Sequence, residues 1–269
     1  MITSLSSIAS PLQKFSCLMA VLMLAGIAPA IAAEPKPDFA VKTKYIDASV
    51  LLDDGIKSNA TLAANCLAEG KRWVEHNRAD AAQEFKASPD LFRENRAWTF
   101  ERSYSRVSQV DGRYVSVVRT DYTYTGGAHP NTDIDTILWD DSAAKRISIR
   151  PFFKETADNG ATMRALRAAA IAAVKADKKA RGIDDAGGID WYKGIEPTLL
   201  KVGAVTLAAS TEPGKSAGLE FHYPPYAVGP YVEGSFVVFV PWQTFEPYLS
   251  PQGAAIFAGD RAKAAKQDK

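Results

Sequence analysis

The spacing of hydrophobic residues predicts a first lobe built from a strand region and one long helix. Residues 39–52 mix Val, Tyr and Ile with polar residues, which is typical of a strand or a pair of strands. From Asn59 to Lys86, apolar residues recur at helical spacing, and Pro89 follows just beyond the end. We therefore predict a helix over this stretch.

The centre of the chain alternates polar and apolar residues with a period of two, which predicts antiparallel strands. Residues 98–104 and 114–124 both alternate in this way, and Asp111-Gly112 lies between them. An Asp-Gly pair between alternating segments is a strong hairpin signal, because both central residues of that turn need a positive φ. A further strand at 134–139 turns into residues 146–150, so we predict an antiparallel meander.

Helical spacing returns between Met163 and Arg181, where an apolar stripe runs from Met163 to Val174. The basic residues of this segment are expected to face away from the stripe. We interpret them as a solvated surface rather than a polyanion site. They are Arg164, Arg167, Lys175, Lys178 and Lys179.

The remaining pattern completes an α+β fold of antiparallel sheets with packed helices in two lobes. Gly187-Gly188 ends the helical region. A short helix is predicted at 191–200, strands at 202–207, 219–223 and 235–240, and a closing short helix at 245–257. The change of pattern along the chain predicts a small N-terminal module at 34–125, a C-terminal α+β domain at 126–259 and a polar tail at 260–269.

Residues 1–33 have the pattern of a secretory signal. Their only charge is Lys14, an apolar run follows at 18–27, and small residues lead up to Ala33. The apolar run is shorter than the about 20 residues that span a bilayer. We expect cleavage near Ala33 and a mature protein in the periplasm or outside the cell, without a stable membrane span. An uncleaved membrane anchor is the alternative.

Cleavage leaves 236 of the 269 residues and removes one lysine and no acid, so 31 Lys and Arg balance 31 Asp and Glu. The full sequence of 269 residues has 46% hydrophobic and 23% charged residues, which is an ordinary globular composition. The balanced charge argues against a nucleic-acid partner. Cys66 is the only cysteine of the mature chain, which excludes an intramolecular disulfide. We interpret it as a small buried hydrophobe rather than a reactive thiol.

Common catalytic and metal-binding motifs are missing or stand in the wrong context. Residues 214–218 fit Gly-x-Ser-x-Gly, but a polar loop precedes the serine and a predicted strand follows it, whereas the nucleophile elbow needs a strand before it and a helix after it. His76, His129 and His222 have no metal-ligand spacing, and no phosphate-binding glycine loop is present. We expect no catalytic residue, no metal and no cofactor.

Two shaped segments are the strongest candidates for a binding site. The first, 122–131, leaves a strand through two glycines and then a proline; the second, 221–234, is stiffened by prolines and carries tyrosines. Each is either a recognition loop or a scaffold in which the side chains bond the backbone. The candidate binding residues are Tyr124, Gly126, Gly127, His129, Asn131, Tyr223, Tyr226 and Tyr231.

These two segments resemble a known extracytoplasmic domain. Tyr-Thr-Gly-Gly-Ala-His-Pro at 124–130 and the run from Gly218 to Gly234 are similar to the domain shared by the RsiV anti-sigma factor ectodomain and the N-terminal part of the PdaC peptidoglycan deacetylase. The resemblance extends to residues 149–153, where the predicted meander ends and a helix follows. A weaker resemblance covers residues 39–125, which are similar to a smaller module that precedes this domain. It implies an envelope binding module, because that sensor binds lysozyme and that deacetylase keeps its catalytic residues in a separate domain.

The leading hypothesis is therefore an exported, soluble, non-enzymatic module that binds a lysozyme-like protein or a peptidoglycan fragment. One alternative is an envelope enzyme, such as a glycan hydrolase that uses two carboxylates, and another is a structural envelope protein. The carboxylates considered for hydrolysis are Asp121, Asp133, Glu220 and Glu233.

Overall fold

The computed structural model describes residues 35–184 and 189–263, which form nine strands in two sheets with helices packed on them. The fold is mixed, and its sheets are mostly antiparallel, as predicted. The predicted signal at 1–33, Gly187-Gly188 and the end of the polar tail lie outside the described residues.

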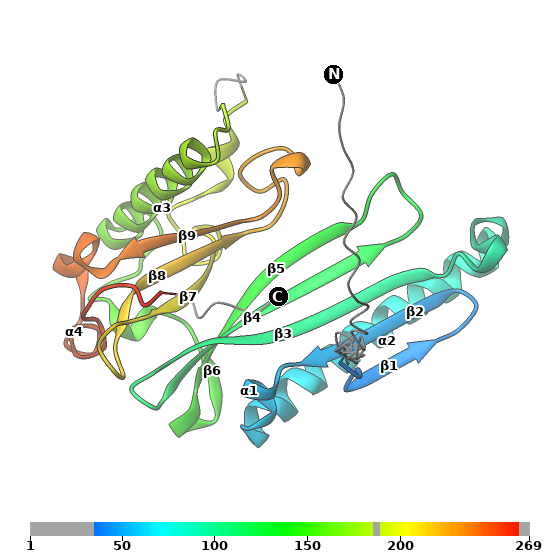
Figure 1. The fold of residues 1–269 in the computed structure, drawn as a ribbon, viewed down its shortest axis with the longest axis horizontal. Helices are drawn as coiled ribbons and strands as arrows, with labels where there is room; N and C mark the ends of the chain where they lie inside the picture. The colour runs from blue at the N-terminus through cyan, green and yellow to red at the C-terminus, as the bar shows by residue number, and fades with distance from the viewer. Residues whose placement is uncertain (1–34, 185–188, 264–269) are drawn as a thin grey trace, which may run out of the picture. The chain divides into compact units, whose positions relative to one another are not determined.

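The first sheet has six strands in the order of the chain (Figure 1). They are β1 (Phe39–Lys42), β2 (Ile46–Leu52), β3 (Trp98–Val110), β4 (Tyr114–Tyr124), β5 (Asn131–Asp140) and β6 (Lys145–Ile147). Asp111 and Gly112 have φ values of 55° and 61°, so the predicted hairpin between β3 and β4 is confirmed. All neighbours are antiparallel except β2 and β3, which are parallel because a helical crossover returns the chain to the same end.

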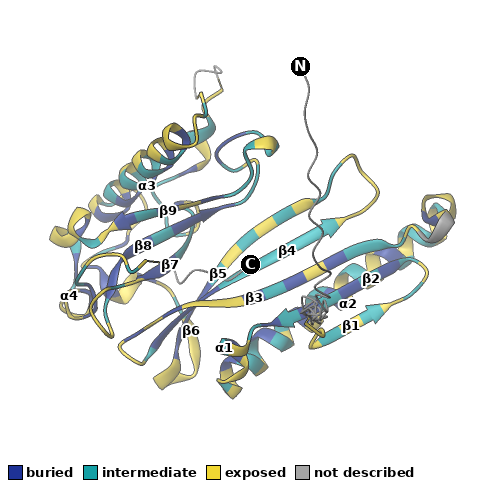
Figure 2. Ribbon diagram, viewed as in Figure 1, coloured by how far each residue is buried: buried dark blue, intermediate teal, exposed yellow. Residues whose placement is uncertain are grey.

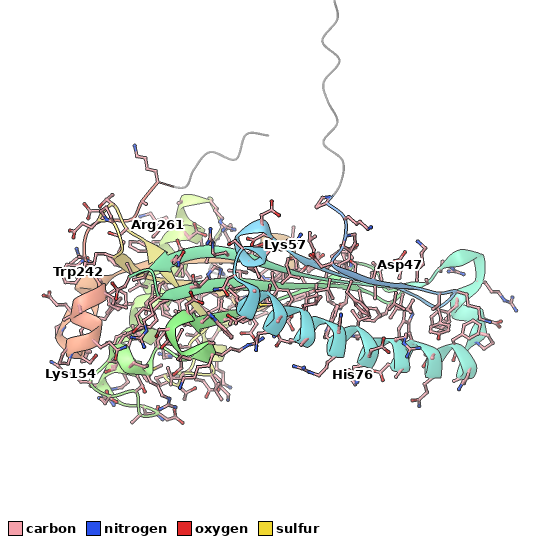
Figure 3. The ribbon with its side chains drawn as sticks, turned by 90° about the horizontal axis from the view of Figure 1, so that it is seen from below. Asp47, Lys57, His76, Lys154, Trp242 and Arg261 are labelled. Carbon is pink, nitrogen blue, oxygen red and sulfur yellow. The ribbon has the colours of Figure 1, made fainter. Side chains whose placement is uncertain are left out.

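That crossover consists of α1 (Asp54–Lys57), α2 (Ala60–Ala87) and η1 (Pro89–Asn95). The Asn59 side chain accepts from Leu62 N and caps α2. Seen from the side, α2 lies along one face of the sheet, and His76 projects away from it (Figure 3). Burial alternates strictly along β2, whose inner residues form a core with α2 and the inner faces of β3, β4 and β5 (Figure 2). Cys66 lies in this core, as predicted.

The second sheet has three antiparallel strands, β7 (Ala204–Ala209), β8 (Ser216–Tyr223) and β9 (Phe236–Pro241), and α3 (Ala161–Ala180) packs against it. Its core includes the apolar stripe of α3 and the aromatic residues near α4 (Pro251–Ile256). Short 3₁₀ turns connect the elements: η2 (Asp141–Ala143), η3 (Arg150–Phe152), η4 (Trp191–Gly194), η5 (Tyr231–Glu233), η6 (Trp242–Thr244) and η7 (Glu246–Tyr248).

Serine and threonine hydroxyls join the edge of β7 to the first sheet. Ser108 Oγ donates to Leu207 O at 2.6 Å, and Leu207 N donates to Ser116 Oγ at 3.1 Å. Val205 N donates to Thr136 Oγ1 at 3.0 Å. These hydroxyls replace the neighbouring strand that β7 lacks on that side, and they satisfy backbone groups that would otherwise be buried without partners.

Two predictions about the second half of the chain are wrong. Residues 191–200 are not an α-helix: after η4 the chain turns, with Val202 N donating to Thr198 O, because Pro197 has no N–H to continue a helix. Lys178 does not face solvent but is buried on the inner stripe of α3. It follows Val174 by four residues, so helical spacing had already placed it on that face.

The predicted boundary between residues 125 and 126 stays a prediction. In the structure this point lies in the loop between β4 and β5, two neighbouring strands of one sheet. Within residues 35–184 and 189–263, no helix combines the length and apolar character needed to cross a bilayer.

Candidate functional site

The two segments singled out from the sequence meet in an aromatic cluster formed by His129, Tyr226 and Tyr231. The His129 ring stacks on Tyr231 with centroids 4.0 Å apart and planes 21° apart. Tyr226 OH lies 3.2 Å from His129 Nε2, and the two tyrosine rings are 5.6 Å apart. Tyr226 is 51% exposed, so the cluster offers ring surface to solvent.

The loop between β4 and β5 holds His129 in place. Gly126 has a φ of 90° and no neighbour near the position of a Cβ, so it allows the chain to leave β4 at a sharp angle. His129 Nδ1 lies 2.9 Å from Pro130 O. Because a carbonyl oxygen only accepts, Nδ1 donates this bond, and Nε2 on the other side of the ring lies beside Tyr226 OH. The backbone contact expected of a scaffold residue is therefore present, and the recognition role of His129 stays a prediction.

Tyr226 is held in an unusual backbone conformation. Its φ is 70°, which costs a bulky residue about 1–2 kcal/mol relative to the right-handed region. Ala227 N donates to Pro224 O at 3.1 Å and closes the turn around it. Backbone strain of this kind persists only where the surroundings fix it, and it is concentrated at functional sites.

A buried ion pair holds the other end of this loop. Lys178 Nζ on α3 lies 3.3 Å from Glu233 Oε2, and Arg181 donates to Ser235 O at 3.3 Å. A Cβ at Gly229 would overlap the Glu233 carboxylate, so any larger residue there would displace that side chain from its position beside Lys178. These contacts fix the segment that carries Tyr231.

The other candidate residues lie outside the cluster. Tyr223 is buried in the second core, where its hydroxyl donates to Val202 O at 2.8 Å and burial raises its pKa. Tyr124 ends β4 with its side chain partly exposed, and Asn131 begins β5 opposite Thr123. Gly126 and Gly127 shape the loop.

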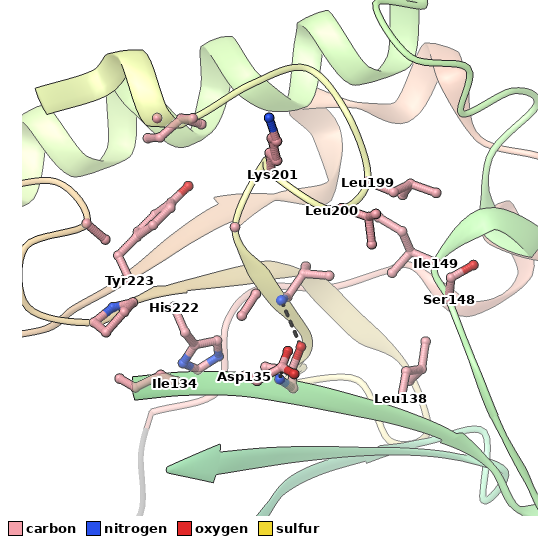
Figure 4. Close-up of a pocket in the computed structure, with 18 of the residues that line it drawn as sticks. Ile134, Asp135, Leu138, Ser148, Ile149, Leu199, Leu200, Lys201, His222 and Tyr223 are labelled. Carbon is pink, nitrogen blue, oxygen red and sulfur yellow. Dashed lines mark hydrogen bonds between the residues drawn. The ribbon is translucent and has the colours of Figure 1, made fainter. Parts of the chain in front are cut away.

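A cleft of about 690 Å³ lies between the two sheets (Figure 4). Pro224 and Ala227, from the loop that carries Tyr226, line one side of it. Its floor includes His222, whose Nε2 lies 2.9 Å from Thr206 Oγ1 and whose pKa is lowered by burial. Most of the walls are apolar: Ile134, Leu138, Ile147, Ile149, Ile195, Leu199, Leu200 and Val205.

Sequence reasoning missed this cleft. The sequence predicts Leu199 and Leu200 within a helix and so gives no sign that they line a cleft. The pairing of β6 with only three residues of β5 can be recognised only in the folded sheet.

The four carboxylates considered for hydrolysis are spread over different elements, and three of them have cationic partners. Asp121 on β4 accepts two hydrogen bonds from Arg102, at 2.6 and 2.5 Å. Asp133, its cross-strand neighbour on β5, lines the same small cleft of about 200 Å³. In contrast, Glu220 on β8 pairs with Arg261, and Glu233 pairs with Lys178.

The serine of the Gly-x-Ser-x-Gly match has a structural role. Ser216 is fully buried at the start of β8, and its hydroxyl donates to Ala208 O at 3.0 Å or Gly218 O at 2.8 Å. A strand follows it, so it is not a nucleophile elbow. Among the described residues, no three His, Cys, Asp or Glu side chains come together as a possible metal site.

Comparison with known proteins gives two family matches and two distant structures. Residues 42–132 match the family described as Deacetylase PdaC, and residues 215–243 match a Protein of unknown function (DUF3298). No curated protein matches the chain. A DUF3298 family protein from Pseudomonas aeruginosa PAO1 is 16% identical, with a TM-score of 0.48, over 80% of this chain and 87% of that one. A member of the same family from Bacteroides fragilis NCTC 9343 is 17% identical, with a TM-score of 0.44, over 71% and 69%. The chain thus carries a PdaC-type segment followed by a DUF3298-type segment, which confirms the resemblance predicted from its sequence and identifies a type of module found in the cell envelope.

Proposed function

We propose that this protein is an exported binding module of the cell envelope that recognises a lysozyme-like protein or a peptidoglycan fragment through the aromatic cluster. The observation that carries this proposal is the meeting of His129, Tyr226 and Tyr231 from two distant segments on a solvent-exposed surface. Rigid tyrosines supply large contact area at a low cost in conformational entropy, which suits both protein surfaces and sugar rings.

The cluster is preorganised for binding. Its rings are held by one another, by the Pro130 carbonyl and by the ion pair at Glu233, so few side chains need to be ordered when a ligand arrives. Val232, which follows Tyr231 in the chain, is 89% exposed. The strain at Tyr226 supports a functional reason for keeping a bulky residue at that position.

The proposal is tested by measuring retention of the purified protein on immobilised lysozymes and on purified cell-wall sacculi, followed by affinity measurement. Tyr226→Ala and His129→Ala are expected to weaken binding about 30-fold or more, since aromatic hot spots cost at least about 2 kcal/mol when truncated. His76→Ala is the matched control, because His76 is exposed on α2 and projects away from the sheet. Tyr226→Asn is a further variant, because Asn tolerates a positive φ and removes only the ring.

Retention by neither lysozymes nor sacculi would overturn the proposal. Loss of the fold in His129→Ala or Tyr226→Asn, measured by circular dichroism, would instead support a scaffold role for the cluster.

We further propose that the module is not an enzyme, since three of the four carboxylates considered have cationic partners. Release of soluble sugar fragments from sacculi by the purified protein would contradict this.

A further inference from the structure

The edge of β5 away from β4 is paired with β6 over only part of its length. β6 pairs only with Leu138–Asp140, so over residues 131–137 no strand of the described part of the chain pairs with the side of β5 away from β4. The cleft of about 690 Å³ includes Ile134, Asp135 and Thr136 of this part and the opposing segment around Leu200. It continues to Leu138 and Ile147, where β6 pairs with β5.

The hydrogen-bond ladder shows which backbone groups of β5 face the cleft. Asp141 N donates to Arg113 O, so in the antiparallel ladder with β4 the odd-numbered residues of β5 bond across to β4. The N–H and C=O of Ile134 then point the other way, toward the cleft. Thr136 N also points that way, and it is satisfied by the Asp135 side chain at 2.7 Å.

The opposing wall and the end of the cleft add an apolar surface and a positive charge. Leu200 is 96% exposed, which is unusual for a leucine beside a cleft with apolar walls. Arg150 lines the end nearest β6, where it donates to Thr156 Oγ1 at 3.3 Å and forms no ion pair within the described residues. Lys201, at the same cleft, is paired with Glu196.

We propose that the cleft binds an extended peptide segment that adds to the edge of β5 as a strand, in line with β6, with apolar side chains against Leu200 and a carboxylate near Arg150. The free backbone groups of Ile134 favour a peptide over an acyl chain, because only a peptide main chain offers both the donor and the acceptor that complete the ladder. Seven residues of β5 at about 3.3 Å each give an edge of roughly 23 Å, long enough for a six-residue strand. The inference is independent of the aromatic cluster.

The test uses a pool of N-acetylated hexapeptides that alternate Val, Ile or Phe with Thr and end in a free carboxylate. Binding is measured by fluorescence anisotropy, and contact with β5 by hydrogen exchange of the Ile134 amide. We expect the pool to bind and to slow exchange at Ile134. The same peptides N-methylated at alternate residues are expected to bind at least ten-fold more weakly, because they lose the ladder donors.

Protein variants separate the contributions of the β5 backbone, the Leu200 side chain and the Arg150 charge to peptide binding. Ile134→Pro removes the outward N–H and replaces the isoleucine side chain with a smaller apolar ring, and proline is tolerated at an edge, so the variant is expected to weaken binding at least ten-fold while the β4 ladder remains. Leu200→Ser and Arg150→Gln keep the fold because both side chains are exposed, and each is expected to weaken binding several-fold. Leu91→Ser, at an exposed leucine on η1, is the matched control, and Tyr226→Asn is expected to keep peptide binding.

Three results would overturn the proposal. These are no binding by any peptide of the pool at millimolar concentration, equal affinity for the N-methylated peptides, and complete displacement of the peptides by dodecanoate with tighter binding of that acyl chain. The last result would assign the cleft to lipid instead.

Discussion

The buried ion pair between Lys178 and Glu233 is expected to contribute strongly to stability, and Glu233→Gln tests this directly. The Lys178 side chain is 2% exposed and that of Glu233 12%, with Nζ and Oε2 3.3 Å apart. Replacing the carboxylate with a neutral amide takes the Glu233 charge away from the buried ammonium group of Lys178. Removing one charge of a buried ion pair is much more costly than the pair is stabilising.

Breaking a buried pair from one side costs about 3–5 kcal/mol, and the partial exposure of Glu233 places the expected loss at the lower end, about 3 kcal/mol. For a unit of this size each kcal/mol lowers Tm by roughly 2–4 °C, so Tm should fall by roughly 6–12 °C. The double variant Lys178→Met with Glu233→Gln removes both charges. It should be more stable than the sum of the two single losses predicts.

Urea unfolding followed by circular dichroism measures the free energy of each variant, and calorimetry measures Tm. Glu196→Gln is the matched control. Glu196 and Lys201 form an ion pair at 2.8 Å, but their side chains are 44% and 58% exposed, so the loss should stay below about 1 kcal/mol. A loss at Glu233 no larger than that of the control, or strictly additive single effects, would refute the reasoning.

Three further predictions concern the first lobe. Burial by itself would raise the pKa of Glu69, but the hydrogen bond and charge of Arg146, together with Arg119, lower it to about 2. Because the pKa of Glu69 is lower in the folded protein than in the unfolded chain, the ionised carboxylate stabilises the fold above about pH 4.5, and this stabilisation is lost as the pH falls toward 2. Glu69→Gln should therefore reduce the fall of Tm with decreasing pH in this range. Burial raises the pKa of the Cys66 thiol to about 12, so Ellman's reagent at pH 8 should modify it only after unfolding in urea, and rapid reaction of the native protein would contradict this. Gly70→Ala should destabilise the fold by about 1–3 kcal/mol in urea unfolding, because a Cβ there would lie 2.7 Å from Val50 Cγ1, and the added change Val50→Ala should recover part of the loss.

The sequence by itself determined the local elements well. The helix predicted from Asn59 to Lys86 is α2 (Ala60–Ala87), and the one predicted from Met163 to Arg181 is α3 (Ala161–Ala180). Asp111-Gly112 marked the hairpin, because only a few residue types adopt two consecutive positive φ values. These signals are local: periodicity, caps and turn residues act within one element, so they can be read without knowledge of the partners.

The candidate site was only partly within reach of the sequence. The glycines, prolines and tyrosines marked both loops as shaped segments, but they did not show that His129 stacks on Tyr231 or that Tyr223 points into the core. Nor did they reveal the cleft, which is lined by residues of both sheets and of the segment around Leu200.

The tertiary structure decided which faces of the elements are buried and which distant residues meet. Helical spacing places Lys178 on the inner stripe of α3, but lysine is rarely buried, and only the structure shows that the carboxylate of Glu233 from another element offsets the cost of burying it. The parallel pairing of β2 with β3 depends likewise on how α2 crosses the sheet. Contacts of this kind depend on packing between elements, and packing energy is a property of the assembled fold, which no local pattern in the chain encodes.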